Sequence, residues 1–339
     1  MKSIAFVIPY FGLFNNYFQL WLNSCSKNPS IDWLIFTDDK RPFDYPDNVH
    51  VTYTTLHEVK KRIESTFGLS IWMEHAYKLC DFKPFYGAIF KPELKNYDFW
   101  GYCDVDLIWG NIRKYLTDDL LDKYYKIFQY GHCCLIKNVD SVTRLYDNSV
   151  SGMLDYKTVL QSPLNYAFDE NNEWGWNVAF DTLLKYEYLK DNWAYDVYVK
   201  KKKFYPADSM DKKKTEGLFE YDNGAVYGYE KIKNTLVKQE YLYVHLQKRD
   251  MAFPEQSVLG NHYLIVPNKF VKYPDRKLDV RLFDKLQPFP FLYMHERQRK
   301  WRKLRNAFLD DSKIKNASRN KLEHYLDKLL GRKEYLWRK

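Results

Sequence analysis

Close to the start of the chain, residues 3–10 form an almost wholly apolar run that is interrupted at Pro9 and followed by Gly12. Such a run is typical of a strand that is buried on both faces of a parallel sheet. Strand and helix patterns then continue along the chain, at residues 16–26 (helix), 32–37 (strand), 49–53 (strand) and 56–67 (helix). This alternation predicts an α/β, Rossmann-like fold whose mainly parallel sheet is flanked by helices.

The patterns of the later part of the chain are more varied. We predict a helix at 72–79, a strand at 99–103, a strand pair at 125–130 and 133–136, a helix at 177–189 and a strand at 241–246. Lysine clusters at 200–203 and 212–214 fall in a turn-rich stretch, and we interpret them as solvated loops, with a lid over a binding site as the alternative.

Composition places the 339 residues among ordinary globular proteins, with 45% hydrophobic and 29% charged residues. The five cysteines show no CxxC spacing, and Cys133 and Cys134 are adjacent, which favours free thiols in a reducing compartment over disulfides or a zinc site. Neither a run of 18 apolar residues nor a small-residue cleavage site is present. We therefore expect a cytoplasmic protein.

Positive charge is concentrated at the carboxyl end. Residues 291–339 hold 15 Lys and Arg against 6 Asp and Glu, an excess that equals the formal charge of +9 of the whole chain. A neutral body with a basic tail argues against a protein that binds duplex nucleic acid and for a local anionic partner. We expect a helical tail that contacts the anionic inner face of a membrane peripherally, with packing on the body or dimerisation as the alternative.

Two carboxylates follow the predicted strand at 99–103, in the triplet Asp104-Val105-Asp106. Like charges at this spacing repel each other, and a divalent cation relieves the repulsion. Carboxylate oxygens suit Mn²⁺ or Mg²⁺, whose remaining coordination positions can take phosphate oxygens. The triplet therefore predicts a metal site for a diphosphate, with a pair of loop aspartates that cap the next element as the alternative.

A second candidate segment follows the predicted strand at 241–246. His245 is a candidate third metal ligand, since imidazole suits first-row ions. Lys248 and Arg249 could neutralise phosphate charge that the metal leaves exposed. A structural histidine is the alternative.

Charged residues also cluster at the end of the predicted helix at 72–79. Lys78, Asp81 and Lys83 are spaced so that at least two can face the same cleft. Asp81 could accept from a ribose hydroxyl or a base, and Lys83 could contact a phosphate. The alternative is a helix end with solvated charges. Pro9, Tyr10 and Asp38, at the ends of the first two strands, and Val105 complete the predicted donor site.

A fourth segment combines acids with two tryptophans. Trp174 and Trp176 offer ring faces that suit the apolar faces of sugar rings, and we predict that they bind the acceptor. A nearby carboxylate could take the proton of the attacking hydroxyl, and Asp169 or Glu170, with Asp181 behind them, is our candidate. A helix entry with ordinary acidic caps is the alternative.

In their order, the segments IPYFG, LCDFKP, GYCDVDLIWG, FDE and VHLQKR resemble the GT-A glycosyltransferases and, more closely, a bacterial family found among capsule and surface-polysaccharide genes. The resemblance covers residues 1 to about 260. It implies that a metal bound by the DxD and a late histidine holds a nucleotide-sugar donor, with UDP as the expected nucleotide. A hexose would pass to a saccharide or lipid-linked acceptor.

The resemblance also implies a domain organisation. We expect a catalytic domain at 1–290, with a donor half at 1–110 and an acceptor half at 111–290, followed by the tail at 291–339. One departure concerns Trp176, which is followed by Asn177 and Val178 where some inverting members carry an acidic pair, so the general base stays open. A haloacid-dehalogenase-like phosphatase and a single-strand-binding protein are the competing functions.

Overall fold

The computed structural model describes residues 1–183, 185–191, 193–198, 202–207, 216–252 and 259–287, and the chain from Met1 to Leu286 forms one compact unit. The predictions for the basic tail and for the lysine cluster at 212–214 lie outside the described residues. All five cysteines are free thiols, as predicted.

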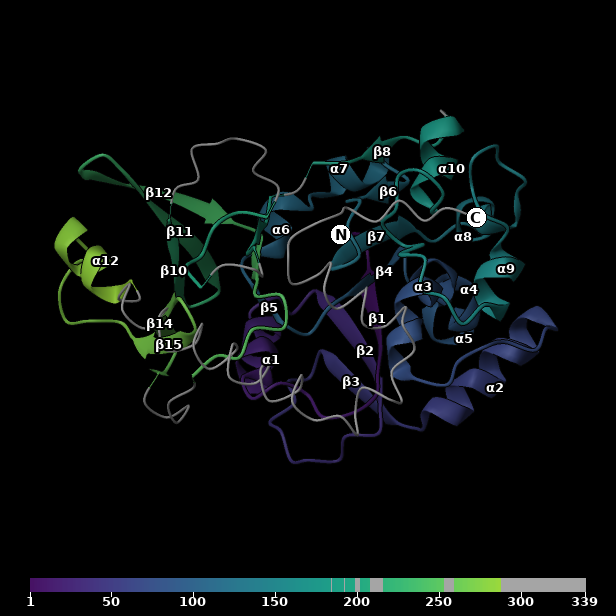
Figure 1. Ribbon diagram of the computed structural model, residues 1–339, viewed down its shortest axis with the longest axis horizontal. Helices are drawn as coiled ribbons and strands as arrows, with labels where there is room; N and C mark the ends of the chain where they lie inside the picture. Colours follow the sequence, from purple (N-terminus) through teal and green to yellow (C-terminus); the bar gives the residue numbers. More distant parts are fainter. Residues whose placement is uncertain (184, 192, 199–201, 208–215, 253–258, 288–339) are drawn as a thin grey trace, which may run out of the picture. The chain divides into compact units, whose positions relative to one another are not determined.

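A seven-stranded sheet lies at the centre of this unit (Figure 1). Its strands are, in spatial order, β3 (Val49–Tyr53), β2 (Ile31–Thr37), β1 (Ile4–Tyr10), β4 (Phe99–Cys103), β7 (Cys133–Lys137), β6 (Lys126–Ile127) and β8 (Tyr188–Leu189). The first four are parallel, β7 is antiparallel to both of its neighbours, and β8 is parallel to β6. The predicted mainly parallel α/β sheet is confirmed.

Helices cover both faces of the sheet. The α-helices are α1 (Phe18–Ser26), α2 (Leu56–Phe67), α3 (Leu79–Phe82), α4 (Tyr86–Ile89), α5 (Lys91–Leu94), α6 (Ile112–Tyr115), α7 (Asp118–Lys123), α8 (Asp140–Thr143), α9 (Tyr156–Gln161), α10 (Asn177–Thr182) and α12 (Val280–Leu286), and the 3₁₀ turns are η1 (Ala76–Lys78), η2 (Lys83–Phe85) and η3 (Leu145–Asp147). Because successive side chains of a strand point to opposite faces, Phe6 packs in the cluster that contains Trp21 of α1, and Val7 packs with Ile63 of α2. Figure 1 shows α1 and α2 on opposite sides of the strands.

The order of the parallel strands creates a crevice. From β1 the chain moves outward through β2 to β3, and it returns on the other side of β1 as β4. This 3-2-1-4 order is that of the first half of a Rossmann fold, and open α/β sheets bind ligands beside the carboxyl ends of the strands where the order reverses. Tyr10 ends β1 and Asp104 follows β4, so both lie at this point.

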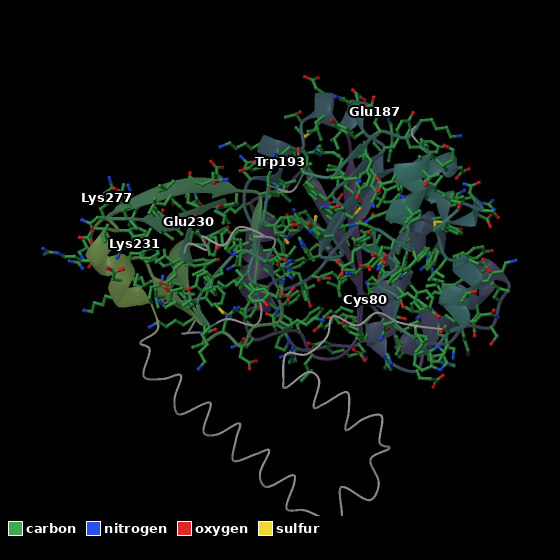
Figure 2. The ribbon with its side chains drawn as sticks, turned by 45° about the horizontal axis from the view of Figure 1, so that its top comes forward. Cys80, Glu187, Trp193, Glu230, Lys231 and Lys277 are labelled. Atoms are coloured by element: carbon green, nitrogen blue, oxygen red, sulfur yellow. The ribbon has the colours of Figure 1, made fainter. Side chains whose placement is uncertain are left out.

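Two smaller sheets complete the unit. One joins β5 (Leu107–Trp109), β13 (Tyr243–His245) and β9 (Tyr195–Asp196). The other is antiparallel, in the order β12 (Thr235–Tyr241), β11 (Ala225–Ile232), β10 (Gly217–Asp222), β14 (His262–Val266) and β15 (Lys269–Lys272). Sequence reasoning did not predict this second sheet. The helix α12 packs on it, and Lys231 of β11 is paired with Asp284 of that helix at 2.6 Å (Figure 2).

Two predicted helices are shorter than expected. The helix predicted at 177–189 ends at Thr182, because residues 188–189 pair with β6 as β8. The helix predicted at 72–79 begins only at Ala76 and continues as a series of short turns. Pro84 has no N–H for a helical hydrogen bond, which favours a new turn at that point. None of the helices in the described part of the chain combines the length and apolarity needed to span a membrane.

The sheet is packed so closely around Gly101 of β4 that it leaves no room for a side chain. A Cβ at this position would lie 2.4 Å from the carbonyl oxygen of Cys134 on β7 and 2.9 Å from the ring of Phe6 on β1. Because the nearest of these atoms belongs to the backbone, the strands would have to shift. We expect Gly101→Ala to lower the free energy of unfolding by about 1–3 kcal/mol, measured by urea denaturation. An unchanged unfolding midpoint would contradict this packing.

Candidate functional site

A pocket of about 640 Å³ opens at the carboxyl ends of β1 and β4. The loop after β1, the turns at 76–86 and the segment after β13 form its walls. Seven of the residues that we predicted to bind the donor line it, namely Pro9, Tyr10, Lys83, Asp104, Val105, Lys248 and Arg249. The pocket thus gathers segments that are far apart in sequence at the switch point of the sheet.

Asp104, Asp106 and His245 meet next to this pocket. One ligand atom from each lies within 4.8 Å of the other two. His245 Nε2 is 3.3 Å from Asp106 Oδ1 and 3.9 Å from Asp104 Oδ2. The strand register explains the meeting, because His245 pairs with Leu107, the residue that follows Asp106. The three residues that we predicted as metal ligands are therefore close enough to share one cation.

The other oxygen of Asp104 contacts a buried lysine. Lys83 Nζ donates to Asp104 Oδ1 at 2.8 Å and to the carbonyl oxygen of Gly131 at 2.8 Å, and it lies 3.8 Å from Asp169 Oδ2. Burial alone would lower the pKa of Lys83, but the charges of Asp104 and its neighbours raise it well above its usual value. Lys83 is thus a fixed positive charge at the edge of the pocket.

The turn after β13 wraps around Asp106. The main-chain N–H of Leu246 donates to the Asp106 carbonyl oxygen at 2.9 Å, and that of Lys248 donates to Asp106 Oδ2 at 2.5 Å. Gln247 and Lys248 both have left-handed backbone conformations, with φ of 50° and 56°. Such conformations are costly for residues other than glycine, and they tend to be kept where function requires them.

The charges of His245 and Asp106 support each other. Burial would lower the pKa of His245, but the carboxylates of Asp106 and Asp196 raise it to about 10. Burial would raise the pKa of Asp106, but the contact with His245 lowers it to about 2. Both groups are therefore charged near neutral pH.

This donor set fits a divalent cation. Two carboxylates and one imidazole form a mixed oxygen and nitrogen set that suits Mn²⁺, and the oxygens also suit Mg²⁺. In the absence of a cation, the positive charges of Lys83 and His245 balance the negative charges of Asp104 and Asp106. A bound cation would take over that role, and His245 would then ligate as a neutral imidazole that has released its Nε2 proton.

Lys78 and Asp81, which we predicted to contact the donor, form a buried ion pair away from the pocket lining. Both side chains are buried, and Lys78 Nζ lies 2.8 Å from Asp81 Oδ2. Lys78 also donates to the carbonyl oxygen of Leu164, while Asp81 accepts from the main-chain N–H groups of Tyr166 and Phe168. The pair fastens the segment at 164–168 to the turns beside the pocket, and neither residue lines the pocket.

Asp38, which we predicted to bind the donor, does not line the pocket but holds a loop of its wall. Its Oδ1 accepts from the main-chain N–H of Gly12 at 2.8 Å. Gly12 has a φ of 97°, a conformation that glycine adopts readily. Asp38 therefore fixes the loop whose residues Phe11 and Leu13 line the pocket.

The predicted acceptor residues lie in different surroundings from those expected. Trp176 is fully buried and stacks on Trp100 with ring centroids 6.3 Å apart, so it is a core residue and its face is closed to a sugar. Trp174 is half-buried and donates through Nε1 to the carbonyl oxygen of Tyr166. The burial of Trp176 corrects its assignment as an acceptor platform.

The predicted catalytic carboxylates do not line the pocket. Asp169 is buried behind Lys83, and Glu170 accepts from the main-chain N–H of Gly131 at 2.9 Å. Asp181 is exposed on α10 and paired with Lys190 at 2.7 Å. Asp169 and Glu170 thus surround the Gly131 turn that also holds Lys83.

Arg249 and Tyr77 complete the wall. Arg249 lines the pocket, and its guanidinium donates to the carbonyl oxygen of Tyr198 at 2.7 Å and to Asn268 at 3.1 Å. Tyr77 is 57% exposed, and Lys248 Nζ lies 4.7 Å from its ring centroid. Cys80, which is labelled in Figure 2, is another residue that lines the pocket. Arg249 therefore anchors the loop, while Tyr77 offers an open aromatic face.

Sequence reasoning missed three residues around the site. Asp196 lies 2.7 Å from His245 Nδ1, His132 packs against the His245 ring with centroids 4.5 Å apart, and Asn15 donates to the carbonyl oxygen of Val105 at 2.9 Å. Asp196 lies in a strand of only two residues, and His132 lies in a turn before β7. Neither segment carries a pattern from which a contact with residue 245 could be predicted.

The pKa of Asp169 leads to a prediction about stability. Burial raises this pKa to about 7, with Lys83 opposing the shift and Glu170 adding to it. Between about pH 4 and pH 7 the folded state keeps a proton that the unfolded state has lost, so stability falls with rising pH, by up to about 1.4 kcal/mol per pH unit. We expect Asp169→Asn to make this fall shallower in urea denaturation at several pH values.

Asp181→Asn is the matched control, because the carboxylate of Asp181 is exposed in a surface ion pair. Its pH dependence of unfolding should follow that of the wild type. An equal slope in the Asp169→Asn variant would contradict the raised pKa.

Residues 6–274 match the family described as "Family of unknown function (DUF6625)". No curated protein is similar enough to the chain to count as a match. The apo form of the glycosyltransferase GlyE of Streptococcus pneumoniae TIGR4 aligns with 57% of this chain and 46% of its own, at 12% identity and a TM-score of 0.29.

The galactosyltransferase LgtC in complex with donor and acceptor sugar analogs aligns with 57% of this chain and 75% of its own, at 9% identity and a TM-score of 0.28. The chain spans less than half the length of GlyE. The family match covers most of the residues that form the sheet and the pocket. The chain therefore belongs to the family of unknown function DUF6625.

Proposed function

We propose that the protein is a metal-dependent glycosyltransferase that binds a nucleotide-sugar donor, with UDP as the expected nucleotide, in the pocket between β1 and β4. The observation that carries the proposal is the meeting of Asp104, Asp106 and His245 within 4.8 Å beside a pocket of about 640 Å³. Pockets of this volume hold ligands of cofactor size, and this one lies at the switch point of the sheet. These two features together favour a nucleotide with a charged diphosphate.

The pocket offers partners for each part of such a donor. Lys83 brings positive charge to the side of the pocket where Asp104 and Asp106 lie, and the ammonium group of Lys248, another lining residue, lies over the Tyr77 ring. Tyr10 and Tyr77 supply ring faces for a base or a sugar. A divalent cation, Mn²⁺ or Mg²⁺, held by Asp104, Asp106 and His245 would supply charge to offset the departing diphosphate.

The protein's own residues then have distinct roles in the proposal. The main-chain N–H of Lys248 holds Asp106, while its side chain lines the pocket and balances charge on the leaving diphosphate. Lys83 orients Asp104 through their 2.8 Å contact, and Asp169 helps to orient Lys83. None of the three predicted catalytic carboxylates lines the pocket, so the proposal assigns no general base.

The acceptor side of the proposal rests on the sequence resemblance. We propose that a hexose passes from the donor to an acceptor that is a saccharide or is linked to a lipid, in the synthesis of a surface polysaccharide. The basic residues at 291–339 would bring the protein to an anionic membrane where a lipid-linked acceptor resides.

Asp106 offers the most direct test of activity. We expect Asp106→Ala and Asp106→Asn to abolish metal-dependent donor hydrolysis and sugar transfer, because each removes a charged ligand. Product formation from nucleotide sugars with Mn²⁺ is the measurement, with circular dichroism to verify the fold. Asp222→Ala is the control, since Asp222 is an exposed acid beside His262 that does not line the pocket.

Sugar transfer at the wild-type rate by a folded Asp106→Asn variant would contradict the proposal. If the wild type hydrolyses a generic aryl phosphate and the Asp104→Asn variant does not, the protein is a phosphatase and not a glycosyltransferase.

A thermal-shift screen would identify the donor. We expect a rise in unfolding temperature that needs both Mn²⁺ and one nucleotide sugar, because a ligand at a hundredfold excess over its dissociation constant stabilises the folded state by about 2.7 kcal/mol. Each nucleotide sugar is measured with Mn²⁺, with chelator and with the nucleoside alone. A shift that is equal with and without metal would contradict the role of the cation.

A further inference from the structure

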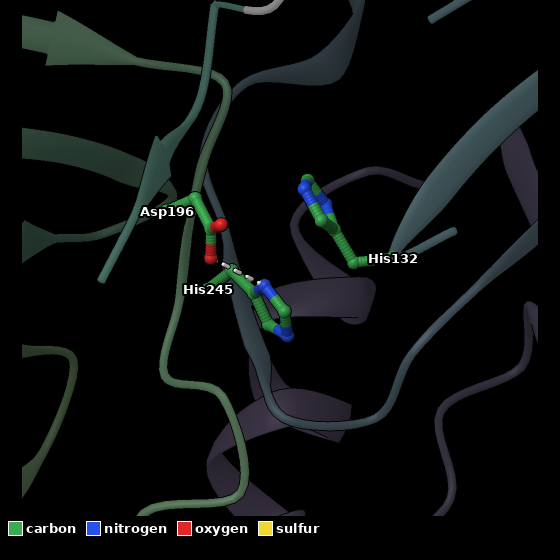
Figure 3. A group of neighbouring side chains, drawn as sticks. All are labelled: His132, Asp196 and His245. Carbon is green, nitrogen blue, oxygen red and sulfur yellow. Dashed lines mark hydrogen bonds and ion pairs between the residues drawn. The ribbon is translucent and has the colours of Figure 1, made fainter. Parts of the chain in front are cut away.

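Asp196 makes two contacts that converge on the proposed metal site. Its Oδ1 lies 2.7 Å from His245 Nδ1, and its two oxygens each accept from Gln247 Nε2 at 2.7 Å. Figure 3 shows the Asp196 carboxylate directed at the His245 ring. One carboxylate thus holds both a proposed metal ligand and the turn that follows it.

The strand register makes this contact a built feature of the fold. Asp196 is the second residue of β9, which pairs in parallel with β13, and its partner in the register is His245. On its other side β13 pairs with β5, where His245 faces Leu107. His245 is therefore held between Asp196 and the segment that carries Asp106.

Asp196 determines which ring nitrogen of His245 faces Asp104 and Asp106. With Nδ1 donating to Asp196, Nε2 is left 3.3 Å from Asp106 Oδ1 and 3.9 Å from Asp104 Oδ2. His132 packs against the ring at an interplanar angle of 34°, and its own Nδ1 lies 2.8 Å from the Tyr243 hydroxyl. A carboxylate on the far nitrogen of a ligating histidine fixes the tautomer and the ring orientation.

The contact between Asp196 and Gln247 supports the turn that binds Asp106. Gln247 and Lys248 form the left-handed turn in which the Lys248 main-chain N–H donates to Asp106 Oδ2. Two successive non-glycine residues in this conformation need support from their surroundings. The hydrogen bonds from the Gln247 side chain to Asp196 supply part of that support.

We propose that Asp196 is the positioning residue of the metal site. It presents His245 Nε2 to a cation bound by Asp104 and Asp106, and it holds the turn that anchors Asp106. The inference rests on the metal site of the proposed function and not on sugar transfer. His132, Asp196 and His245 form a second group in which one ligand atom of each residue lies within 4.8 Å of the other two. We assign Asp196 a supporting role because His245 and Gln247 already engage both of its oxygens.

The test is the affinity of the full-length protein for Mn²⁺, measured by electron paramagnetic resonance of the free ion. We expect Asp196→Ala to weaken binding about 10- to 100-fold. Asp196→Asn keeps an acceptor oxygen for His245 and should retain more of the affinity. Glu220→Gln is the matched control, because Glu220 also contacts a histidine, His262 at 2.8 Å, on the second sheet.

The unfolding temperature in chelator separates positioning from simple structural support. If Asp196 were only structural, Asp196→Ala would unfold at a lower temperature, yet the folded protein would bind Mn²⁺ as the wild type does, which would overturn the inference. A loss of Mn²⁺ binding in His132→Ala as large as that in Asp106→Asn would also overturn it, since the cation would then lie between His132, Asp196 and His245.

The two proposals can fail separately. Mn²⁺ binding that depends on Asp106 and Asp196, without turnover of any nucleotide sugar, would support the positioning role and contradict the glycosyltransferase. Turnover that needs Mn²⁺, with unchanged Mn²⁺ affinity in Asp196→Ala, would support the enzyme and contradict the positioning role. A wild type that binds no Mn²⁺ would contradict both.

Discussion

The repulsion between two carboxylates at the end of β4 organises the surroundings of the pocket. Asp104 and Asp106 are one residue apart where β4 ends, and positive groups lie on both of them. Lys83 reaches Asp104 from the turns after α3, and His245 reaches Asp106 from β13. Each of these cations is buried and therefore needs a carboxylate partner in return. The balance of charge thus ties three distant segments together.

The small sheet of β5, β13 and β9 makes this balance possible. Its register places His245 beside Asp196 and opposite Leu107, so that geometry and charge agree at one point. The turn after β13 adds main-chain N–H groups to Asp106, at the cost of two left-handed residues. A flexible loop could not hold these groups within hydrogen-bond distance, whereas strand pairing fixes them before any ligand binds.

The pocket joins this charged end to a more apolar wall. The loop after β1 is held by Asp38 through Gly12, and the opposite wall is held by the buried pair of Lys78 and Asp81. These residues act through the backbone that they fasten. Several charged residues near a pocket therefore support its shape, and only some of them face the ligand.

Much of the fold follows from local patterns. The strands β1, β2 and β4 and the helices α1 and α2 lie close to where apolar periodicity predicts them, because a buried strand or an amphipathic helix needs that periodicity to cover its core face. The second sheet was not predicted, and residues 188–189 became a strand and not the end of a helix. Strand pairing between distant segments overrides the weak preferences of such short stretches.

The sequence by itself determined the parallel sheet and the carboxylates at the end of β4, since both depend on neighbours along the chain. It also singled out Lys83, Lys248 and His245 as residues with suitable chemistry. Only the tertiary structure decided that His245 meets Asp106, that Asp196 stands behind it, and that Trp176 is buried in the core. These outcomes depend on strand register and on packing between segments that are far apart in the chain, and no local pattern encodes such distances.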